Sequence, residues 1–380
     1  MSEWRYEDSG SFYNYLPRGC EICRMGASLV LFVTGLCNRG CFYCPLSSAR
    51  RNRDVIFANE REIESRGSIQ EDGNGGSILE DGSKRDLLAE GTGDALFESI
   101  LEEARLIGAL GTGITGGEPI LKLDLVCQII SALKREFGSD HHIHMYTGAR
   151  PGHGVLLRLR EAGLDEIRIH PIYSDWAAPE GLSDLLKEAR SLGMEAGVEI
   201  PAVEAAPMII RAVKDAGAFL NLNELEFSET NQEELKRRGF RAKNYGSGAS
   251  GSFTVARKHF MDDELRMHYC SSRFKDAVQL RERLLRRSAR VRRPFDIVTE
   301  DGTLIHGTID SESGDLELAQ KMLEISGVPE DMYSVVDDRI EVAGWILEEF
   351  SKELKSIGCT VALVERYPVE RGLVVERIPL

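Results

Sequence analysis

The chain has 380 residues, a net charge of −15 and 42% hydrophobic residues, which is ordinary for a globular protein with a full core. So acidic a chain is a poor non-specific ligand for nucleic acid or anionic membranes, although a local basic patch is still allowed. Its first ten residues are polar and charged, unlike a secretory signal, and its longest apolar stretch is too short for a membrane helix. The composition therefore predicts a cytoplasmic protein that does not associate with membranes.

A short buried strand is predicted at residues 29–34, because branched and aromatic residues run without interruption up to Gly35. Strands and helices alternate from there to residue 227. Helices are expected at 94–106, 123–137, 155–162, 183–192 and 207–216. Further strands are expected at 110–114, with a turn that continues to 119, and at 142–147, 166–172, 195–203 and 222–227. This alternation predicts an α/β fold with a parallel sheet, and its six strands indicate a partial (β/α)6 barrel.

The chain divides by pattern into a barrel and flanking segments. We expect an N-terminal segment at 1–28, the barrel at 29–230, a connecting region at 231–293 and a C-terminal domain at 294–380. Residues 50–93 interrupt the barrel with Arg, Glu, Asp and Gly, and part of this stretch is predicted to be a long mobile insertion. The last domain has a strand pair turning at Asp301-Gly302, two helices and two final strands, which is typical of a small α+β domain.

The cysteines carry the strongest chemical signal. Five of the eight lie between Cys20 and Cys44, and in a cytoplasmic chain such groups favour metal or redox chemistry over structural disulfides. One loop reads Cys37-Asn-Arg-Gly-Cys41-Phe-Tyr-Cys44. Four thiolates saturate a cubane iron–sulfur cluster, so three leave one iron open for another ligand. An open metal position is what chemistry requires.

This C-x3-C-x2-C loop, placed directly after a first strand, resembles the signature of radical S-adenosylmethionine enzymes. A second motif, Thr115-Gly-Gly-Glu-Pro119, follows the next predicted strand and is similar to the Gly-Gly-Glu-Pro element of that family. Paired glycines let a backbone approach a ligand closely, and the carboxylate beside them can accept hydrogen bonds from an ammonium group. The resemblance covers about residues 29–230. It is closest to the group related to pyruvate formate-lyase activating enzymes, including archaeal members of unassigned function.

The resemblance implies a [4Fe–4S] cluster on Cys37, Cys41 and Cys44 that reductively cleaves S-adenosylmethionine. The resulting 5′-deoxyadenosyl radical would abstract hydrogen from a substrate, with ferredoxin or flavodoxin as reductant. The residues implied in cofactor binding are Tyr43 against the adenine, Gly116, Gly117, Glu118 and Pro119, and His170 and Glu199 at the ends of later strands.

A further metal site is suggested by cysteines outside the loop. Cys20-Glu-Ile-Cys23 precedes the first strand, and His268-Tyr-Cys270 lies far along the chain. Together they could form a Cys3His zinc site, or the three cysteines could hold an auxiliary iron–sulfur cluster. The alternative is a reduced thiol pair beside an unrelated Cys270.

The substrate is left open by the sequence. The segment Arg281–Arg293 is rich in arginine, which pairs well with phosphate, so RNA is one candidate partner. A solvated helix with salt bridges to the acidic remainder is the alternative. One hypothesis is modification of RNA or protein, with this segment and the C-terminal domain as docking surfaces. A second is a small-molecule radical mutase or synthase, and a third is a non-catalytic module that senses metal or redox state.

Overall fold

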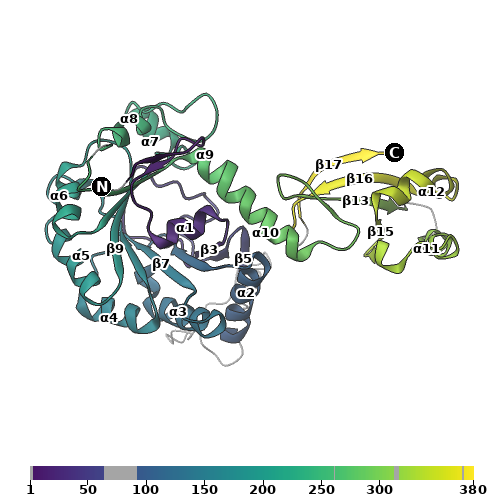
Figure 1. The fold of residues 1–380 in the computed structure, drawn as a ribbon, viewed down its shortest axis with the longest axis horizontal. Coiled ribbons are helices and arrows are strands. Elements are labelled where there is room, and N and C mark those ends of the chain that lie inside the picture. The colour runs from purple at the N-terminus through teal and green to yellow at the C-terminus, as the bar shows by residue number, and fades with distance from the viewer. Residues whose placement is uncertain (1–2, 64–91, 261, 312–315, 370–371) are drawn as a thin grey trace, which may run out of the picture. The chain divides into compact units, whose positions relative to one another are not determined.

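The computed structural model describes residues 3–63, 92–260, 262–311, 316–369 and 372–380. They form two compact units (Figure 1). The larger consists of Met1–Arg105 with Ala109–Val278, and the smaller of Leu106–Gly108 with Gln279–Leu380. Residues 64–91 lie outside the described residues, and with them most of the predicted mobile insertion. No helix in the described ranges is both long and apolar enough to cross a membrane.

The larger unit is built on one sheet, in the order β1-β2-β11-β10-β9-β8-β7-β6-β3-β4-β5. Among the described residues, seven of its strands run parallel to one another. They are β3 (Ser28–Phe32), β6 (Gly111–Thr115), β7 (His142–Thr147), β8 (Glu166–Ile169), β9 (Glu195–Pro201), β10 (Phe219–Asn223) and β11 (Arg266–Cys270). The predicted number of six parallel strands was therefore wrong by one.

The missed strand β11 and the misplaced strand β10 have a common cause. Strand β10 begins at Phe219 rather than at residue 222, and its Asn221 and Asn223 break the apolar run that signals a strand. Strand β11 also has a polar residue at every second position, Arg-Met-His-Tyr-Cys, and with five residues this alternation is too short to identify a strand by itself. In both strands the polar side chains are turned to the polar interior described below.

Short antiparallel strands extend both edges of the sheet. Strands β1 (Arg5–Tyr6) and β2 (Phe12–Tyr13) add to β11, and β4 (Ile56–Ala58) and β5 (Arg61–Ile63) add to β3. The sheet path ends at β1 and at β5 in the described chain, so it is open. Residues 56–63, which lie within the region 50–93 set apart as an insertion, form a hairpin at the edge of the sheet, and its strands are too short to show a strand period.

Helices cover the outer face of the sheet, while α1 (Arg18–Arg24) lies on its inner side (Figure 1). The five predicted helices are confirmed with small shifts of their ends. They are α2 (Thr92–Ile107), α3 (Leu123–Phe137), α4 (His153–Ala162), α5 (Leu182–Ser191) and α6 (Pro207–Asp215). The remaining helical segments are η1 (Pro119–Lys122), η2 (Tyr173–Asp175), α7 (Gln232–Arg237), α8 (Ser252–Arg257), α9 (Ser272–Phe274) and the π-helical η3 (Lys275–Leu280).

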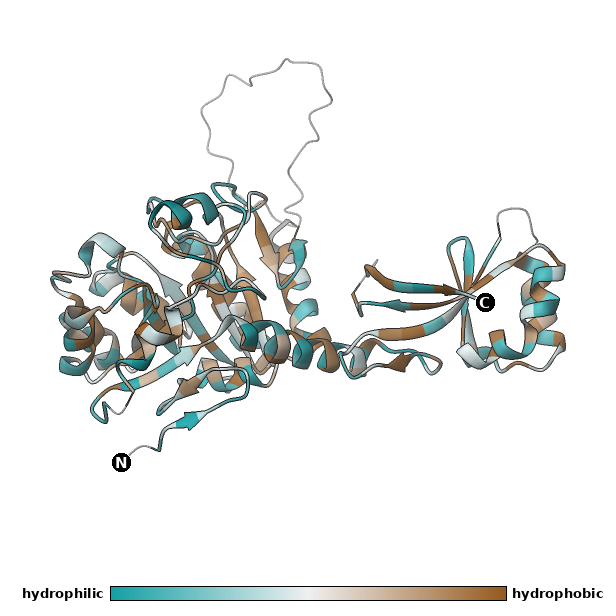
Figure 2. Cartoon of the chain, turned by 90° about the horizontal axis from the view of Figure 1, so that it is seen from above, coloured by the Kyte–Doolittle hydropathy of each residue, from teal (hydrophilic) through white to brown (hydrophobic). Residues whose placement is uncertain are grey.

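The helix α3 shows why these segments form. Its buried residues Val126, Ile129, Ile130 and Leu133 recur every three or four positions, so they form one apolar stripe against the sheet. Figure 2 shows the result, with hydrophobic colour concentrated in the strands and both colours along the surrounding helices.

The two faces of the parallel strands differ in polarity. On the outer face Ile143, Ile167 and Val198 are fully buried beneath the helices. The alternate positions carry His144, Arg168, Glu199 and Asn221, which are also buried but face α1. Because successive strand residues point to opposite faces, one polar and one apolar layer result. The inside of the curved sheet is therefore a buried polar interior rather than an apolar core.

The smaller unit is an antiparallel sheet with helices packed on one face. Its strands are β12 (Ile297–Val298), β13 (Leu304–Asp310), β14 (Tyr333–Val336), β15 (Arg339–Val342), β16 (Thr360–Arg366) and β17 (Val374–Pro379). Its helices are α10 (Arg281–Val291), α11 (Leu316–Ile325), η4 (Glu330–Met332) and α12 (Gly344–Ser356). Ile309, Leu323 and Ile346 meet in its fully buried core. The predicted mixture of helices and strands is confirmed, and the hairpin β14–β15 was missed.

Candidate functional site

The loop that carries Cys37, Cys41 and Cys44 leaves the carboxyl end of β3. Parallel sheets bind ligands at this end of their strands. The backbone N–H of Cys44 donates to the Cys41 carbonyl over 3.1 Å, and the N–H of Arg39 donates to the Cys37 Sγ over 3.3 Å. The loop therefore holds its three thiols on one short turn.

The three loop thiols are electrostatic neighbours. Burial raises the pKa of the Cys37 and Cys41 thiols, and the neighbouring Cys44 thiol raises both further. In the described part of the chain, however, no group of three or more His, Cys, Asp or Glu side chains is closed tightly enough to hold a metal ion. The donor set fits an iron–sulfur cluster chemically, because three thiols and an N–H···S hydrogen bond are what such clusters use.

The Gly-Gly-Glu-Pro motif packs directly on this loop. The N–H of Gly117 donates to the Thr34 carbonyl over 2.6 Å, and that of Glu118 donates to the Leu36 carbonyl over 2.9 Å. A Cβ atom on Gly116 would lie 2.6 Å from the Thr34 oxygen, and one on Gly117 would lie 2.4 Å from the Leu36 oxygen. Glycine is thus required here by the cysteine loop itself. Contact of these glycines with a cofactor stays a prediction.

The Glu118 carboxylate joins the ends of two strands. It is 2% exposed and accepts hydrogen bonds from the Thr147 hydroxyl over 2.6 Å, from Gly148 N–H over 2.9 Å and from Ile120 N–H over 3.2 Å. Pro119 is buried and opens η1, where its fixed φ suits a first helical residue. The predicted role of Glu118 as acceptor for an ammonium group is untested, and in this structure three protein donors occupy the carboxylate.

Tyr43 and His170 link the cysteine loop to the strand ends. The Tyr43 hydroxyl lies 3.0 Å from His170 Nε2, while His170 Nδ1 lies 2.7 Å from the Glu199 carbonyl oxygen. Tyr43 is 5% exposed, and its carbonyl oxygen accepts a hydrogen bond from Asn231. Burial raises the Tyr43 pKa far above 10 and lowers that of His170, so both side chains are neutral near pH 7. They hold the loop in place, and their contact with adenine or ribose stays a prediction.

The Glu199 side chain points into the polar interior. Its carboxylate accepts hydrogen bonds from Arg168 over 2.8 Å, Asn221 over 3.0 Å and Asn223 over 2.7 Å. Burial would raise the pKa of Glu199, but these donors hold it below its usual value. This arrangement favours a structural role for Glu199, because its oxygen atoms already accept hydrogen bonds from the protein.

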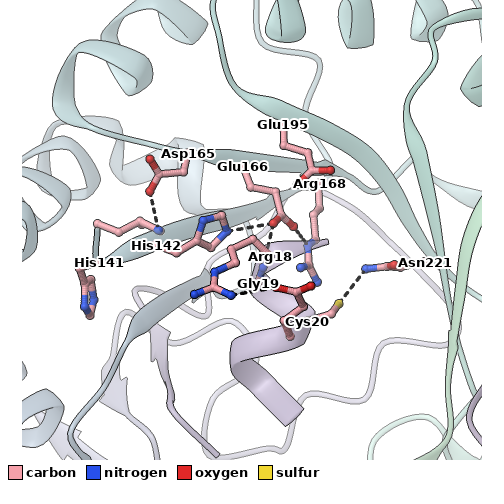
Figure 3. A network of polar contacts seen from close by, with 12 residues as sticks. Arg18, Gly19, Cys20, His141, His142, Asp165, Glu166, Arg168, Glu195 and Asn221 are labelled. Carbon is pink, nitrogen blue, oxygen red and sulfur yellow. Dashed lines mark hydrogen bonds and ion pairs between the residues drawn. The ribbon is translucent and has the colours of Figure 1, made fainter. Parts of the chain in front are cut away.

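The centre of the interior is Arg168, which sequence reasoning missed (Figure 3). Its guanidinium bonds Glu166 over 2.5 Å, Glu199 over 2.8 Å and the Tyr146 hydroxyl over 2.9 Å. Burial would raise the Glu166 pKa, but Arg168 and His142 hold it far below its usual value. The available signal was the alternation of polar residues within two predicted strands, His142-Ile-His-Met-Tyr and Glu166-Ile-Arg.

Helix α1 packs against the polar network around Arg168 and forms hydrogen bonds with it. The N–H of Gly19 donates to Glu166 Oε2 over 3.1 Å, and a Cβ atom on Gly19 would lie 2.6 Å from His144 Nδ1. The next residue, Cys20, accepts a hydrogen bond from Asn221 Nδ2 over 3.4 Å (Figure 3). The N-terminal C-x2-C pair is therefore inside the curved sheet.

The residues of the predicted second metal site, Cys20, Cys23, His268 and Cys270, lie on this inner side of the sheet. Cys20, Cys23 and Cys270 each have a pKa raised to about 12, mainly by burial, and each thiol acts electrostatically on another of the three. His268 is 4% exposed, and its Nδ1 is buried with no hydrogen-bond partner in the described residues. Whether these residues bind a metal is untested.

The arginine segment is largely engaged within the smaller unit. Arg286 donates to the carbonyls of Ile107 and Gly108 over 3.1 and 2.5 Å, and Arg287 donates to the Pro368 carbonyl over 2.6 Å. Arg293 pairs with Asp296 over 3.0 Å. These contacts favour the structural alternative over a phosphate-binding surface, and RNA binding itself stays a prediction.

Comparison with known proteins gives one extensive match. A protein of Methanocaldococcus jannaschii is 36% identical to this chain over 385 residues. The match covers 97% of this chain and 94% of the relative, which is named "Putative glycyl-radical enzyme activating enzyme". A family described as a domain of unknown function, DUF8061, matches residues 302–380.

The similarity of this chain to two solved structures is weak. Two structures of mutant tryptophan synthase α-subunits from Pyrococcus furiosus are 16% and 18% identical to this chain. Each match covers 46% of this chain and 79% of the other, with TM-scores of 0.26 and 0.25. Likeness at this level carries no argument about function.

Proposed function

Because the chain belongs to the radical S-adenosylmethionine family, in the group of its Methanocaldococcus jannaschii relative, we propose that it is an activating enzyme for a protein substrate. The proposed cofactors are S-adenosylmethionine and a [4Fe–4S] cluster bound by Cys37, Cys41 and Cys44. The open parallel sheet would be the partial barrel of this family, with one strand more than the sequence predicted. The protein would act in the cytoplasm with ferredoxin or flavodoxin as electron donor.

One observation carries the proposal, namely the direct attachment of the Gly-Gly-Glu-Pro motif to the cysteine loop. Gly117 and Glu118 donate their N–H groups to carbonyls of residues 34 and 36, which lie next to the first cysteine. Two motifs about 70 residues apart in sequence thus form one surface at the carboxyl ends of β3 and β6. Such an arrangement is what a shared metal–cofactor site requires.

When bound by Cys37, Cys41 and Cys44, the cluster would supply the one electron needed for reductive cleavage of S-adenosylmethionine. The protein's own residues position and shield this site. Arg39 N–H donates to the Cys37 sulfur, and such hydrogen bonds tune a cluster's reduction potential. Tyr43 and His170, both neutral, fix the last part of the loop.

A protein substrate is favoured over the other hypotheses because the relative's name describes an enzyme that activates another enzyme. The RNA hypothesis has less support, since Arg286, Arg287 and Arg293 make contacts within their own unit. A small-molecule mutase or synthase is the second candidate, and the buried polar interior is its only specific support.

The test is anaerobic reconstitution with iron and sulfide, followed by dithionite, S-adenosylmethionine and chromatography of 5′-deoxyadenosine. The wild-type chain should form this product, and Cys41→Ala should not. The matched control is Cys127→Ala, because Cys127 lies on the outer helix α3. Equal product in Cys41→Ala and wild type would contradict the proposal.

The substrate class is tested in the same assay with added protein. A candidate glycyl-radical enzyme should acquire a stable electron paramagnetic resonance signal only in the presence of the wild-type chain. A signal that also appears with Cys41→Ala would show that the radical has another source.

A further inference from the structure

The inner side of the curved sheet carries a second set of thiols that the proposed reaction does not use. In the register of β10 and β11, Asn221 pairs with His268 and Asn223 pairs with Cys270. Because alternate strand residues share a face, these four side chains lie on one side of the sheet. Asn221 also donates to the sulfur of Cys20 over 3.4 Å, which identifies this side as the one that faces α1.

Helix α1 presents two thiols to this face. Cys20 and Cys23 are three residues apart in α1, so they lie on one side of the helix with Cβ atoms about 5–6 Å apart. Cys23 and Cys270 are near enough to act on each other electrostatically, and so are Cys20 and Cys270. The thiols of Cys20 and Cys23, near the start of the larger unit, thus lie close to that of Cys270, near its end.

The surroundings supply a fourth donor and a balancing charge. His268 Nδ1 is buried without a hydrogen-bond partner in the described chain, and a buried polar atom of this kind normally has one. Lys275 lowers the pKa of both Cys23 and Cys270, against the stronger effect of burial. Lys275 also pairs with Glu226 over 2.5 Å, so its positive charge is shared between that carboxylate and a centre in which three thiolates outweigh a divalent ion by one negative charge.

We propose that these three thiols hold a zinc ion and that His268 completes its tetrahedron. Three cysteines and one histidine form a standard closed zinc set. The side chains are neighbours in this structure but not a closed coordination sphere. Binding requires rotation of cysteine side chains about their χ1 bonds.

A bound zinc would fasten α1 to β11, that is, the N-terminal segment to the last parallel strand. Metal binding energy becomes folding energy when the ligands come from distant segments. Binding would also displace the thiol protons, since thiolates are the metal ligands. The role is structural, so the proposal does not depend on the proposed reaction.

The experiment uses the full chain with Cys37, Cys41 and Cys44 changed to Ala, so that the loop cannot compete for metal. Titration with Co²⁺ under anaerobic conditions should give thiolate-to-cobalt charge-transfer absorption that saturates at one ion per chain. Added Zn²⁺ should then remove the band. No band in this variant would overturn the proposal.

Two additional variants identify the ligands. Cys270→Ser, added to the triple variant, should weaken Co²⁺ binding by about 100-fold or more, because even loss of an outer-shell contact costs 10–100-fold. Cys127→Ser in the same background is the matched control and should bind Co²⁺ as before. A cobalt–thiolate band that survives Cys270→Ser with unchanged affinity would overturn the assignment.

Folding and metal identity are checked independently. Circular dichroism should show the same helix content in both variants. Elemental analysis of the triple variant, isolated without chelator, should find zinc and no iron. Iron with sulfide in place of zinc would overturn the zinc assignment and indicate an iron–sulfur cluster on the same thiols.

Discussion

The N–H of Gly117 donates to the carbonyl oxygen of Thr34 over 2.6 Å, so the second sequence motif is attached to the backbone that leads into the first. A side chain on Gly117 would collide with this backbone rather than with a flexible neighbour, because the nearest atoms are the carbonyls of Leu36 and Gly35 at 2.4 and 2.7 Å. The absence of side chains on Gly116 and Gly117 therefore allows this motif to pack directly against the backbone of the cysteine loop.

Gly117→Ala should displace the cysteine loop and sharply reduce iron uptake on reconstitution. Overpacking against fixed backbone costs about 1–3 kcal/mol, enough to shift the loop away from its metal-binding conformation. The matched control is Gly40→Ala in the same loop, where an added Cβ atom meets nothing within 4 Å. Iron and sulfide content per chain is the measurement, and full iron loading in Gly117→Ala would contradict the interpretation.

Arg168→Met should strongly destabilise the larger unit. The guanidinium is buried and pairs with Glu166 and Glu199, so its removal leaves two buried carboxylates without their cation. Breaking such a pair costs about 3–5 kcal/mol. Urea unfolding measures the loss. Arg211→Met, which removes an exposed pair with Asp215 at 4.0 Å, should change stability by only about 0–1 kcal/mol; equal effects of the two variants would refute the argument.

The smaller unit should be most stable in mildly acid solution. His306 is buried, 3.3 Å from Asp296 and 3.5 Å from Glu341, and Arg293 pairs with both carboxylates. Burial would lower the His306 pKa, but the two carboxylates raise it above 6.5. Its stabilisation is therefore complete below pH 6.5 and is lost as pH rises through the raised value.

The carboxylates set the lower limit of the pH range in which the smaller unit is stable. Burial would raise the pKa of Glu341, but His306 and Arg293 lower it from 4.5 to about 2. The contribution of the Glu341 carboxylate to the free energy of unfolding is complete above pH 4.5 and is lost as pH falls towards 2. Urea unfolding followed by Trp345 fluorescence, with Trp4 and Trp176 changed to Phe, measures this profile. His306→Gln should remove the decline above pH 6.5, and His153→Gln, an exposed control, should retain it.

Arg286→Ala should affect stability rather than RNA binding. The side chain donates to two backbone carbonyls of its own unit, and a hydrogen bond from a charged donor contributes about 1.5–3 kcal/mol. Thermal unfolding and RNA titration of the same protein separate the two roles. The exposed Arg292→Ala serves as control. Weaker RNA binding in Arg286→Ala without a change in unfolding would favour the docking hypothesis instead.

The chemistry of the proposed centre and the order of most elements could be predicted from the sequence alone. Local spacing is sufficient for Cys37, Cys41 and Cys44, because three thiols in one short loop can reach one metal without knowledge of the fold. Helix α3 was predicted with both of its ends correct, since its apolar residues recur at helical spacing over four turns. The family follows from these local motifs together with the full-length relative.

Other features depend on pairing between residues far apart in the chain. Strand β11 has only five residues, so its alternation of polar and apolar side chains is too short to identify it, and its place is decided by pairing with β10, where His268 lies beside Asn221. The same applies to Arg168, whose charge is tolerated because Glu166 and Glu199 arrive from the same and the neighbouring strand. Glu118 likewise meets Thr147 only after β6 and β7 pair. A buried polar interior is stabilised by its partners, and tertiary structure alone decides which partners meet.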